Sequence, residues 1–318
     1  MKNASFETLL DDLKISIRFA LRNVISYVLA IIGVFLVTII LIAVVAAFVL
    51  VPIVISPAGF QAFSLWAESL EGWFAAGGVE IATGIFLIAL PFVAPFFVAC
   101  GALFGMAREI VESEGTSAEG VFTWYKKKFF SLAGGGIVLF LFILGPVMLV
   151  ILGAVAVFGE QILNVAFIGV GSTSTMNPLI SALGVIWFVF STGLMTMLFP
   201  AIIDGHSVAE ATKKSIRMGI QYFDRVFGTW LSYILLIVIL VSPLPIMGLP
   251  GLLTSSFWPA LIPLGIYAVI MVLFLAFVLL PALSIGLTRV YMILTAEDED
   301  VILEESEDEG GPSFIGGV

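Results

Sequence analysis

Residues 24–51 of the chain are VISYVLAIIGVFLVTIILIAVVAAFVLV, an apolar run without a charged side chain. A helix needs about 20 mostly apolar residues to cross the hydrocarbon core of a bilayer. The run meets that length and is far longer than the roughly 7–15 apolar residues of a cleavable signal peptide. It therefore predicts a transmembrane helix that is retained in the mature protein.

The composition of the whole chain agrees with this first run. Of the 318 residues, 61% are apolar and 11% are charged, whereas soluble domains carry about 25% charged residues. We therefore expect an all-α, polytopic transmembrane helical bundle with about six spans. The predicted spans, all without an internal charge, are Val24–Val51, Ile81–Ala107, Phe129–Phe158, Leu179–Ile203, Phe227–Met247 and Ala260–Thr288.

The positions of Lys and Arg predict the topology. All 13 basic residues lie in the N-terminal segment or after the second, fourth and sixth predicted spans. The connections 52–80, 159–178 and 248–259 contain none. Because cytoplasmic loops are enriched in Lys and Arg, we expect a multi-pass protein of the cell (cytoplasmic) membrane with both termini in the cytoplasm.

The chain contains an internal repeat. Residues Thr8–Arg18 (TLLDDLKISIR) align without gaps with Ser207–Arg217 (SVAEATKKSIR), and Thr116–Glu119 opens a weaker third copy. In each copy a hydroxyl residue stands three positions before an acid, which is the capping-box arrangement of a helix start. We expect three hairpins, each preceded by a cytoplasmic interfacial helix, near residues 6–107, 116–203 and 207–289 of a membrane domain at 1–296.

Glycines and prolines add two expectations about helix packing. The sequence Gly101-x-x-x-Gly105 and the run Gly134–Gly136 predict close approaches between helices, since glycine leaves room for a neighbouring backbone or side chain. The return helices contain prolines, which remove a backbone donor and predict kinks. These prolines are Pro91, Pro95, Pro200 and Pro281.

The segments Lys14-x-Ser-Ile-Arg18 and Lys213-x-Ser-Ile-Arg217 precede long spans. Together with the Pro-containing return helices, this pattern resembles a loosely defined group of uncharacterised prokaryotic six-helix membrane proteins. The group includes the membrane domain attached to some glycerophosphodiester phosphodiesterases. The resemblance covers most of Asp11–Arg289, and it implies the fold without carrying over a catalytic activity.

Candidate chemistry is sparse in this sequence. The chain has one cysteine, Cys100, and one histidine, His206, which excludes an intramolecular disulfide and a cysteine-based zinc site. Asp204, His206 and Ser207 are nearly consecutive, and adjacency in sequence does not give the geometry of a catalytic triad. We expect Asp204 to end one helix and Ser207 to cap the next. The expectation is a non-enzymatic protein without metal or cofactor.

The basic clusters on the cytoplasmic side are candidate contacts for anionic lipid headgroups. Each Lys or Arg near such a surface adds about 1 kcal/mol of attraction. The alternative is that these residues only direct the topology. The candidate residues are Lys14, Arg18, Lys126, Lys127, Lys128, Lys213, Lys214 and Arg217.

The C-terminal segment is strongly acidic. Nine acidic residues and no basic ones fall within 297–309, and such a density of like charge predicts a disordered cytoplasmic tail over 297–318. A basic cytoplasmic protein is the candidate partner, and a solubilising appendage without a partner is the alternative. The candidate docking residues are Glu304, Glu305, Phe314 and Ile315.

Three classes of function follow from this organisation. The first is a non-enzymatic scaffold or subunit of a membrane complex that contacts lipids or a cytoplasmic partner. The second is a transporter or permease component for neutral or amphiphilic solutes, which the Pro-interrupted hairpins favour. The third is an enzyme of the lipid phase, although the spans contain no acid–base set. We expect the first class, with membrane lipids and complex subunits as partners and no nucleic acid.

Overall fold

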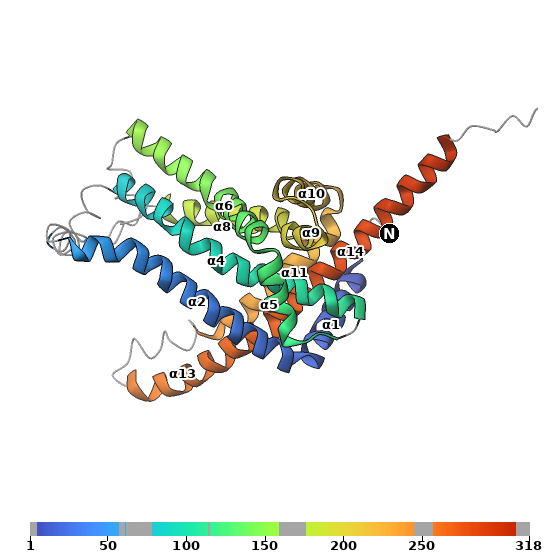
Figure 1. Ribbon diagram of the computed structural model, residues 1–318, viewed down its shortest axis with the longest axis horizontal. Coiled ribbons are helices and arrows are strands. Elements are labelled where there is room, and N and C mark those ends of the chain that lie inside the picture. Colours follow the sequence, from blue (N-terminus) through green and yellow to red (C-terminus); the bar gives the residue numbers. More distant parts are fainter. Residues whose placement is uncertain are drawn as a thin grey trace, which may run out of the picture. The chain divides into compact units, whose positions relative to one another are not determined.

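The computed structural model describes residues 5–56, 61, 78–113, 115–158, 176–244 and 257–309. Every regular element within these ranges is a helix (Figure 1), so the predicted all-α class is confirmed. The elements are α1 (Phe6–Arg22), α2 (Val24–Ile55), α4 (Gly78–Ser113), α5 (Ala118–Lys127), α6 (Phe129–Phe158), α8 (Met176–Leu194), α9 (Leu198–Asp204), α10 (Val208–Gln221), α11 (Phe223–Val241), α13 (Phe257–Phe274), η1 (Leu275–Leu279) and α14 (Leu280–Glu309).

Among the described residues, 6 helical segments are long and apolar enough to cross a membrane. Their outer faces carry large apolar side chains, such as Ile39, Leu149 and Ile239, which are 64%, 70% and 70% exposed. Water would not tolerate so many exposed apolar groups on a monomer, whereas lipid does. The chain is therefore a multi-pass membrane protein. The segments are Val24–Phe48, Val93–Ser113, Phe129–Val150, Ala182–Asp204, Phe223–Val241 and Pro263–Ala296.

The chain divides into two compact units. Unit 1 consists of Met1–Asn23, Ala107–Gly115 and Tyr222–Val318, and unit 2 consists of Val24–Met106 and Thr116–Gln221. This division cuts across the three repeat segments expected from the sequence, whose boundaries stay a prediction. α1 thus packs in a different unit from α2, the span that follows it directly in sequence.

Unit 2 contains the glycine contacts that the sequence predicts. A Cβ atom added to Gly105 of α4 would overlap the Trp124 ring of α5. Similarly, a Cβ added to Gly135 of α6 would lie 2.5 Å from Cδ1 of Ile202 in α9. These distances are too short for any side chain, so the expectation of close approaches at the glycines is confirmed.

Two of the proline-containing spans are interrupted, whereas α4 continues through Pro91 and Pro95. The predicted span Leu179–Ile203 is broken between Leu194 and Leu198, so that Pro200 falls in the first turn of α9. A proline is tolerated there because the first amides of a helix have no partner within it. Ahead of Pro281 the helix widens into the π-helix η1, since proline cannot donate to the carbonyl four residues earlier.

The helix starts differ in part from the predicted capping boxes. Ser207 and Glu210 form the complete box, with 3.0 Å from the Ser207 amide to Glu210 Oε2 and 3.3 Å from the Glu210 amide to Ser207 Oγ. The prediction for Thr8 is wrong, because α1 begins one turn earlier, where Ser5 Oγ accepts from the Thr8 amide at 3.2 Å. For α5 the N-cap is Ser117, one residue after the predicted Thr116, and its side chain makes no capping bond.

The last helix is longer than the sequence predicts. The span Ala260–Thr288 was expected to lead into a disordered tail from residue 297, whereas α14 runs to Glu309. Helix propagation adds one hydrogen bond for each residue fixed, so an established span favours extension of its helix beyond the membrane. The boundary of the membrane domain at 296 stays a prediction.

Candidate functional site

Three surface helices, α1, α5 and α10, precede the spans α2, α6 and α11. α10 packs against α6, α8 and α9 in unit 2, and α5 packs against α2 in the same unit. In unit 1, α1 packs against α11, η1 and α14 (Figure 1). In each case the surface helix contacts a hairpin other than the one it leads into. α1 contacts the last hairpin of the chain.

The buried faces of α1 and α10 correspond to each other in the repeat alignment. The hydroxyl of Ser16 contacts the Tyr233 hydroxyl at 2.5 Å, and its counterpart Ser215 donates to the Leu194 carbonyl at 2.8 Å. Both serines are fully buried. The aligned buried pairs are Asp12 with Ala211, Ser16 with Ser215, and Ala20 with Gly219.

A second pair of contacts is also equivalent between the two units. A Cβ at Gly228 would lie 2.9 Å from Leu9 Cδ1, and a Cβ at Gly134 would lie 3.3 Å from Val208 Cγ2. Leu9 aligns with Val208 in the repeat, and each glycine lies in the second turn of its span helix. The same surface-helix position therefore packs on a glycine in both units.

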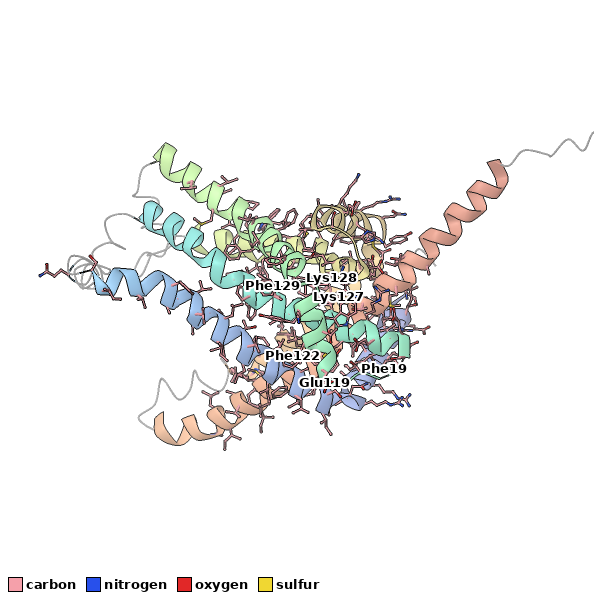
Figure 2. The ribbon with its side chains drawn as sticks, viewed as in Figure 1. Phe19, Glu119, Phe122, Lys127, Lys128 and Phe129 are labelled. Atoms are coloured by element: carbon pink, nitrogen blue, oxygen red, sulfur yellow. The ribbon has the colours of Figure 1, made fainter. Side chains whose placement is uncertain are left out.

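The predicted lipid-contact residues lie on these surface helices, mostly on their exposed sides. The Lys14 side chain is 75% exposed, with Nζ 3.9 Å from the Asp11 carboxylate. On α5, which carries Phe122 and Lys127 in Figure 2 and is followed by its C-cap Lys128, Lys127 Nζ lies 5.3 Å from the centre of the Trp124 ring. The exposed residues are Lys14, Arg18, Lys126, Lys127, Lys213 and Arg217, and the half-buried ones are Lys128 and Lys214.

The turn between α9 and α10 shows why the three polar residues there form no triad. Asp204 ends α9, and Gly205 follows in the left-handed conformation with φ of 118°. Ser207 is occupied as the cap of α10, while His206 Nε2 contacts Lys214 Nζ at 3.0 Å. Hydrogen bonds from the Ser207 amide and hydroxyl lower the pKa of the exposed Glu210 carboxyl below its ordinary value. These side chains therefore stabilise the junction between α9 and α10.

Unit 1 contains a buried ionic cluster that the sequence analysis did not single out. Asp12 of α1 is 4% exposed, and its Oδ1 accepts a hydrogen bond from Arg289 Nη1 of α14 at 2.6 Å. Its other oxygen, Oδ2, lies 3.5 Å from Arg225 Nη2 of α11. The cluster joins three helices and carries one negative and two positive charges.

The hydrogen bonds inside this cluster are incomplete. Among its buried side-chain atoms, Asp12 Oδ2 and Arg225 Nε have no hydrogen-bond partner in the described part of the chain. Breaking a buried ion pair by removing one partner costs roughly 3–5 kcal/mol, because the other charge is left uncompensated. Among the described residues, Asp12 is the one acid that forms ion pairs with the two arginines. Its carboxylate therefore compensates both positive charges.

A second polar contact continues from this cluster along α1 and α11. The Ser16 hydroxyl also contacts the Leu13 carbonyl at 2.9 Å, and the Tyr233 hydroxyl contacts the Ala282 carbonyl at 2.7 Å. The two hydroxyls have two protons between them and three contacts, so only two of the three are hydrogen bonds at one time. A Cβ at Gly286 would lie 2.8 Å from the Tyr233 oxygen, so glycine at this position makes room for the tyrosine.

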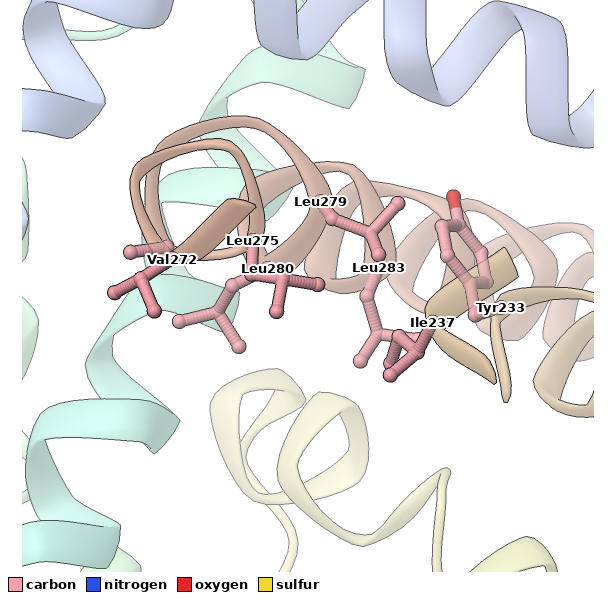
Figure 3. A pocket seen from close by; sticks show the side chains of 8 residues that line it. Tyr233, Ile237, Val272, Leu275, Leu279, Leu280 and Leu283 are labelled. Carbon is pink, nitrogen blue, oxygen red and sulfur yellow. The ribbon is translucent and has the colours of Figure 1, made fainter. Parts of the chain in front are cut away.

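An apolar groove of about 380 Å³ lies beside Tyr233. One side consists of Tyr233 and Ile237 from α11, and the rest comes from the end of α13, from η1 and from the start of α14. Figure 3 shows Tyr233 and Ile237 at one end of the groove and Val272 at the other. The further lining residues include Leu275, Leu279 and Leu283.

A signal for the cluster is present in the sequence. Asp11 and Asp12 are neighbours, and the repeat places Asp12 at the position of the small residue Ala211. A charged residue on the face that is small and apolar in the other copy indicates a buried partner of opposite charge. Arg225 and Arg289 stand at the ends of spans, where the sequence analysis assigned them only to topology.

The remaining predicted site residues belong to the C-terminal segment. Glu304 and Glu305 have a helical backbone within α14, whereas Phe314 and Ile315 lie outside the described residues. Within the described ranges, no group of three or more His, Cys, Asp and Glu side chains is placed to hold a metal ion. Comparison of the chain with family models, curated proteins and solved structures found no match.

Proposed function

We propose that this protein is a non-enzymatic scaffold or subunit of a membrane complex in the cell membrane, with both termini in the cytoplasm. Its proposed cytoplasmic face binds anionic lipid headgroups through the cations of α1, α5 and α10. The observation that carries this proposal is the arrangement of α1. Its polar and small residues Asp12, Ser16 and Ala20 are buried against protein, while Lys14 and Arg18 are exposed.

The apolar side chains of the same helix support this placement. Phe6 is 75% exposed and Leu21 is 51% exposed. Besides its buried face and its basic face, the helix therefore has an apolar face, which suits insertion at the boundary between headgroups and acyl chains. The Lys126–Lys128 cluster at the end of α5 stands beside Phe130, which is 87% exposed. Cations next to exposed aromatic side chains are typical of an interfacial segment.

Lipid analysis of the purified protein tests this proposal. In mild detergent, anionic phospholipid should co-purify in excess over its share in the membrane. The substitutions Lys126→Gln, Lys127→Gln and Lys128→Gln together should reduce that excess severalfold, and the matched triple change to Arg should retain it. Equal enrichment in all three proteins, with topology unchanged, would show that the cations only direct insertion.

The acidic end of α14 is the proposed docking segment for a basic cytoplasmic partner, with Glu304 and Glu305 as contacts. Opposite charges speed association and fix orientation. A protein that co-purifies with the tagged full-length chain should be lost when residues 297–318 are deleted, and its retention should fall steeply with salt. If deletion leaves the set of co-purifying proteins unchanged, the segment is a solubilising appendage.

A second candidate is a permease component for amphiphilic solutes, and the interrupted span at η1 and Pro281 favours it. Reconstituted vesicles distinguish the two candidates. A permease accelerates the flux of an amphiphilic fluorescent solute, whereas a scaffold leaves it at the rate of protein-free vesicles. The resemblance to the membrane domain of glycerophosphodiester phosphodiesterases stays part of this proposal, at the level of fold.

A further inference from the structure

His206 and Lys214 lie just beyond the end of a span. The apolar segment Ala182–Asp204 ends two residues before His206, and the surface helix α10 follows, with its exposed cations Lys213 and Arg217. We propose that His206 is a pH-sensitive switch, whose protonation displaces Lys214 towards the membrane surface and strengthens the binding of anionic lipid by α10. The inference rests on the proposed function, because it assigns a regulation to one of the three lipid-binding helices.

The contact between the two side chains requires a neutral histidine. Lys214 Nζ lies 3.0 Å from His206 Nε2. An ammonium group has three N–H donors and no acceptor, so a hydrogen bond forms here only when Nε2 carries no proton. In this state the lysine is held at the junction between α9 and α10, and it is half-buried, whereas its neighbour Lys213 is exposed.

Protonation of His206 turns this attraction into repulsion. Nε2 then becomes a donor, and two positive charges would stand 3.0 Å apart. The imidazolium has another partner within reach, because Asp204 Oδ2 lies 3.7 Å from the same nitrogen. The expected rearrangement is therefore an ion pair between His206 and Asp204, with the Lys214 ammonium displaced from Nε2.

The other charged groups at the junction act in the same direction. Asp204 ends α9, and Glu210, whose carboxyl interacts electrostatically with His206, lies in the first turn of α10. α6 and α8, which also pack against α10, contain no charged residue. While His206 is neutral, two acids and Lys214 give the junction a net negative charge, which repels anionic headgroups. Protonation removes this excess of negative charge.

Histidine suits this role because it is the side chain whose charge ordinarily changes between about pH 5 and 8. His206 is the single histidine of the chain. A response in this pH range that is lost in His206→Gln therefore originates at this junction. One positive charge gained beside an anionic surface strengthens attraction about fivefold, and the displaced lysine adds to that gain.

Photolabelling at two pH values tests the proposal on the full-length chain in nanodiscs. The probe is phosphatidylglycerol with a diazirine close to its headgroup, and phosphatidylcholine with the same diazirine is the zwitterionic control. Between about pH 7.5 and about pH 5.5, labels from phosphatidylglycerol on α10 should increase about fivefold, while those from phosphatidylcholine should not. Equal phosphatidylglycerol labelling at both pH values would overturn the switch and leave the proposed lipid binding intact. No excess over phosphatidylcholine at either pH would refute lipid binding by α10 itself.

Two substitutions of the histidine isolate its charge. His206→Gln, which stays neutral, should keep the labelling of α10 at the low level at both pH values. His206→Arg, which stays charged, should give the high level at both. A pH response that persists in His206→Gln would place the titrating group elsewhere and overturn the proposal.

NMR titration of His206 tests the contact without relying on lipid. Selective ¹³C labelling of histidine, in protein purified without a histidine tag, reports this residue alone. In Lys214→Gln the imidazole should protonate at a higher pH than in the unaltered protein, because a neighbouring positive charge is removed. Lys213→Gln is the matched control with the same change of charge, and it should have little effect. Equal effects of the two substitutions would show that His206 and Lys214 do not interact.

Discussion

Asp12 and Arg289 are separated by 277 positions in the sequence, and their side chains meet at 2.6 Å in a partly buried, hydrogen-bonded ion pair. The pair fixes α1 to the last helix of the membrane domain. Asp11, the adjacent residue, has a side chain that is 69% exposed and faces Lys14. Two neighbouring aspartates thus have opposite environments, which provides a matched comparison.

Asp12→Asn should destabilise unit 1 by roughly 3 kcal/mol or more, because it leaves Arg225 and Arg289 without a counter-charge. Asp11→Asn should change the free energy of unfolding little, as expected of an exposed ion pair. Thermal unfolding of both variants in detergent measures the difference. Equal unfolding temperatures for the two variants would contradict the assigned role of Asp12.

Tyr233→Phe and Ser16→Ala should be coupled. Each single change should cost about 1 kcal/mol, the net value of one buried hydrogen bond. The double variant should cost less than the sum, because both changes remove the same contact between hydroxyls. A double-mutant cycle in SDS-induced unfolding measures the coupling, and strict additivity would show that the two hydroxyls do not interact.

Gly105→Ala should destabilise unit 2 by roughly 1–3 kcal/mol, because the new Cβ overlaps the Trp124 ring and forces a shift of α5. Gly145 of α6 is the control, since nothing lies within 4 Å of a Cβ added there. Gly145→Ala should be neutral or stabilising by up to about 1 kcal/mol, since alanine favours a helix more than glycine does. Unfolding of both variants under the same conditions decides between them.

The pH dependence of α10 should follow Glu210. Its pKa is lowered from the ordinary value of 4.5 by the bonds to Ser207, so its contribution to helix stability is present above pH 4.5. That contribution is lost as the pH falls through the lowered pKa. In Ser207→Ala the pKa of Glu210 should return towards 4.5, as measured by NMR titration of the Glu210 carboxyl carbon. An unchanged pKa would show that the capping box does not form in solution.

Accessibility of single cysteines tests the topology. In a Cys100→Ala background, cysteines at Ser69, Gly171 and Ser255 should react with an impermeant maleimide in intact cells. Cysteines at Ser113 and Ser306 should react only after the membrane is opened. External labelling at Ser113 would overturn the assignment that follows from the basic residues.

The spans could be predicted from the sequence because lipid imposes a simple requirement of length and apolarity on each segment alone. α6 occupies the predicted bounds Phe129–Phe158 without change.

The candidate site depends on contacts that no local pattern specifies. The repeat predicts that α1 is a surface helix, but it does not predict which hairpin α1 packs against. Asp12 is buried only because α11 and α14 supply Arg225 and Arg289. Likewise, Pro281 predicts an interruption of its span, while the choice of a π-helix over a simple kink depends on the packing of its neighbours.

The continuity of α14 has a mechanical consequence. The helix runs for 30 residues from Leu280 to Glu309 without a break, which is about 45 Å. A loop at the membrane surface would absorb a pull on the acidic end, whereas an unbroken helix carries the load along its axis to Pro281 and the π-helix before it. A pulling force applied at Glu309 is therefore transmitted to η1, the π-helical segment that lines the groove.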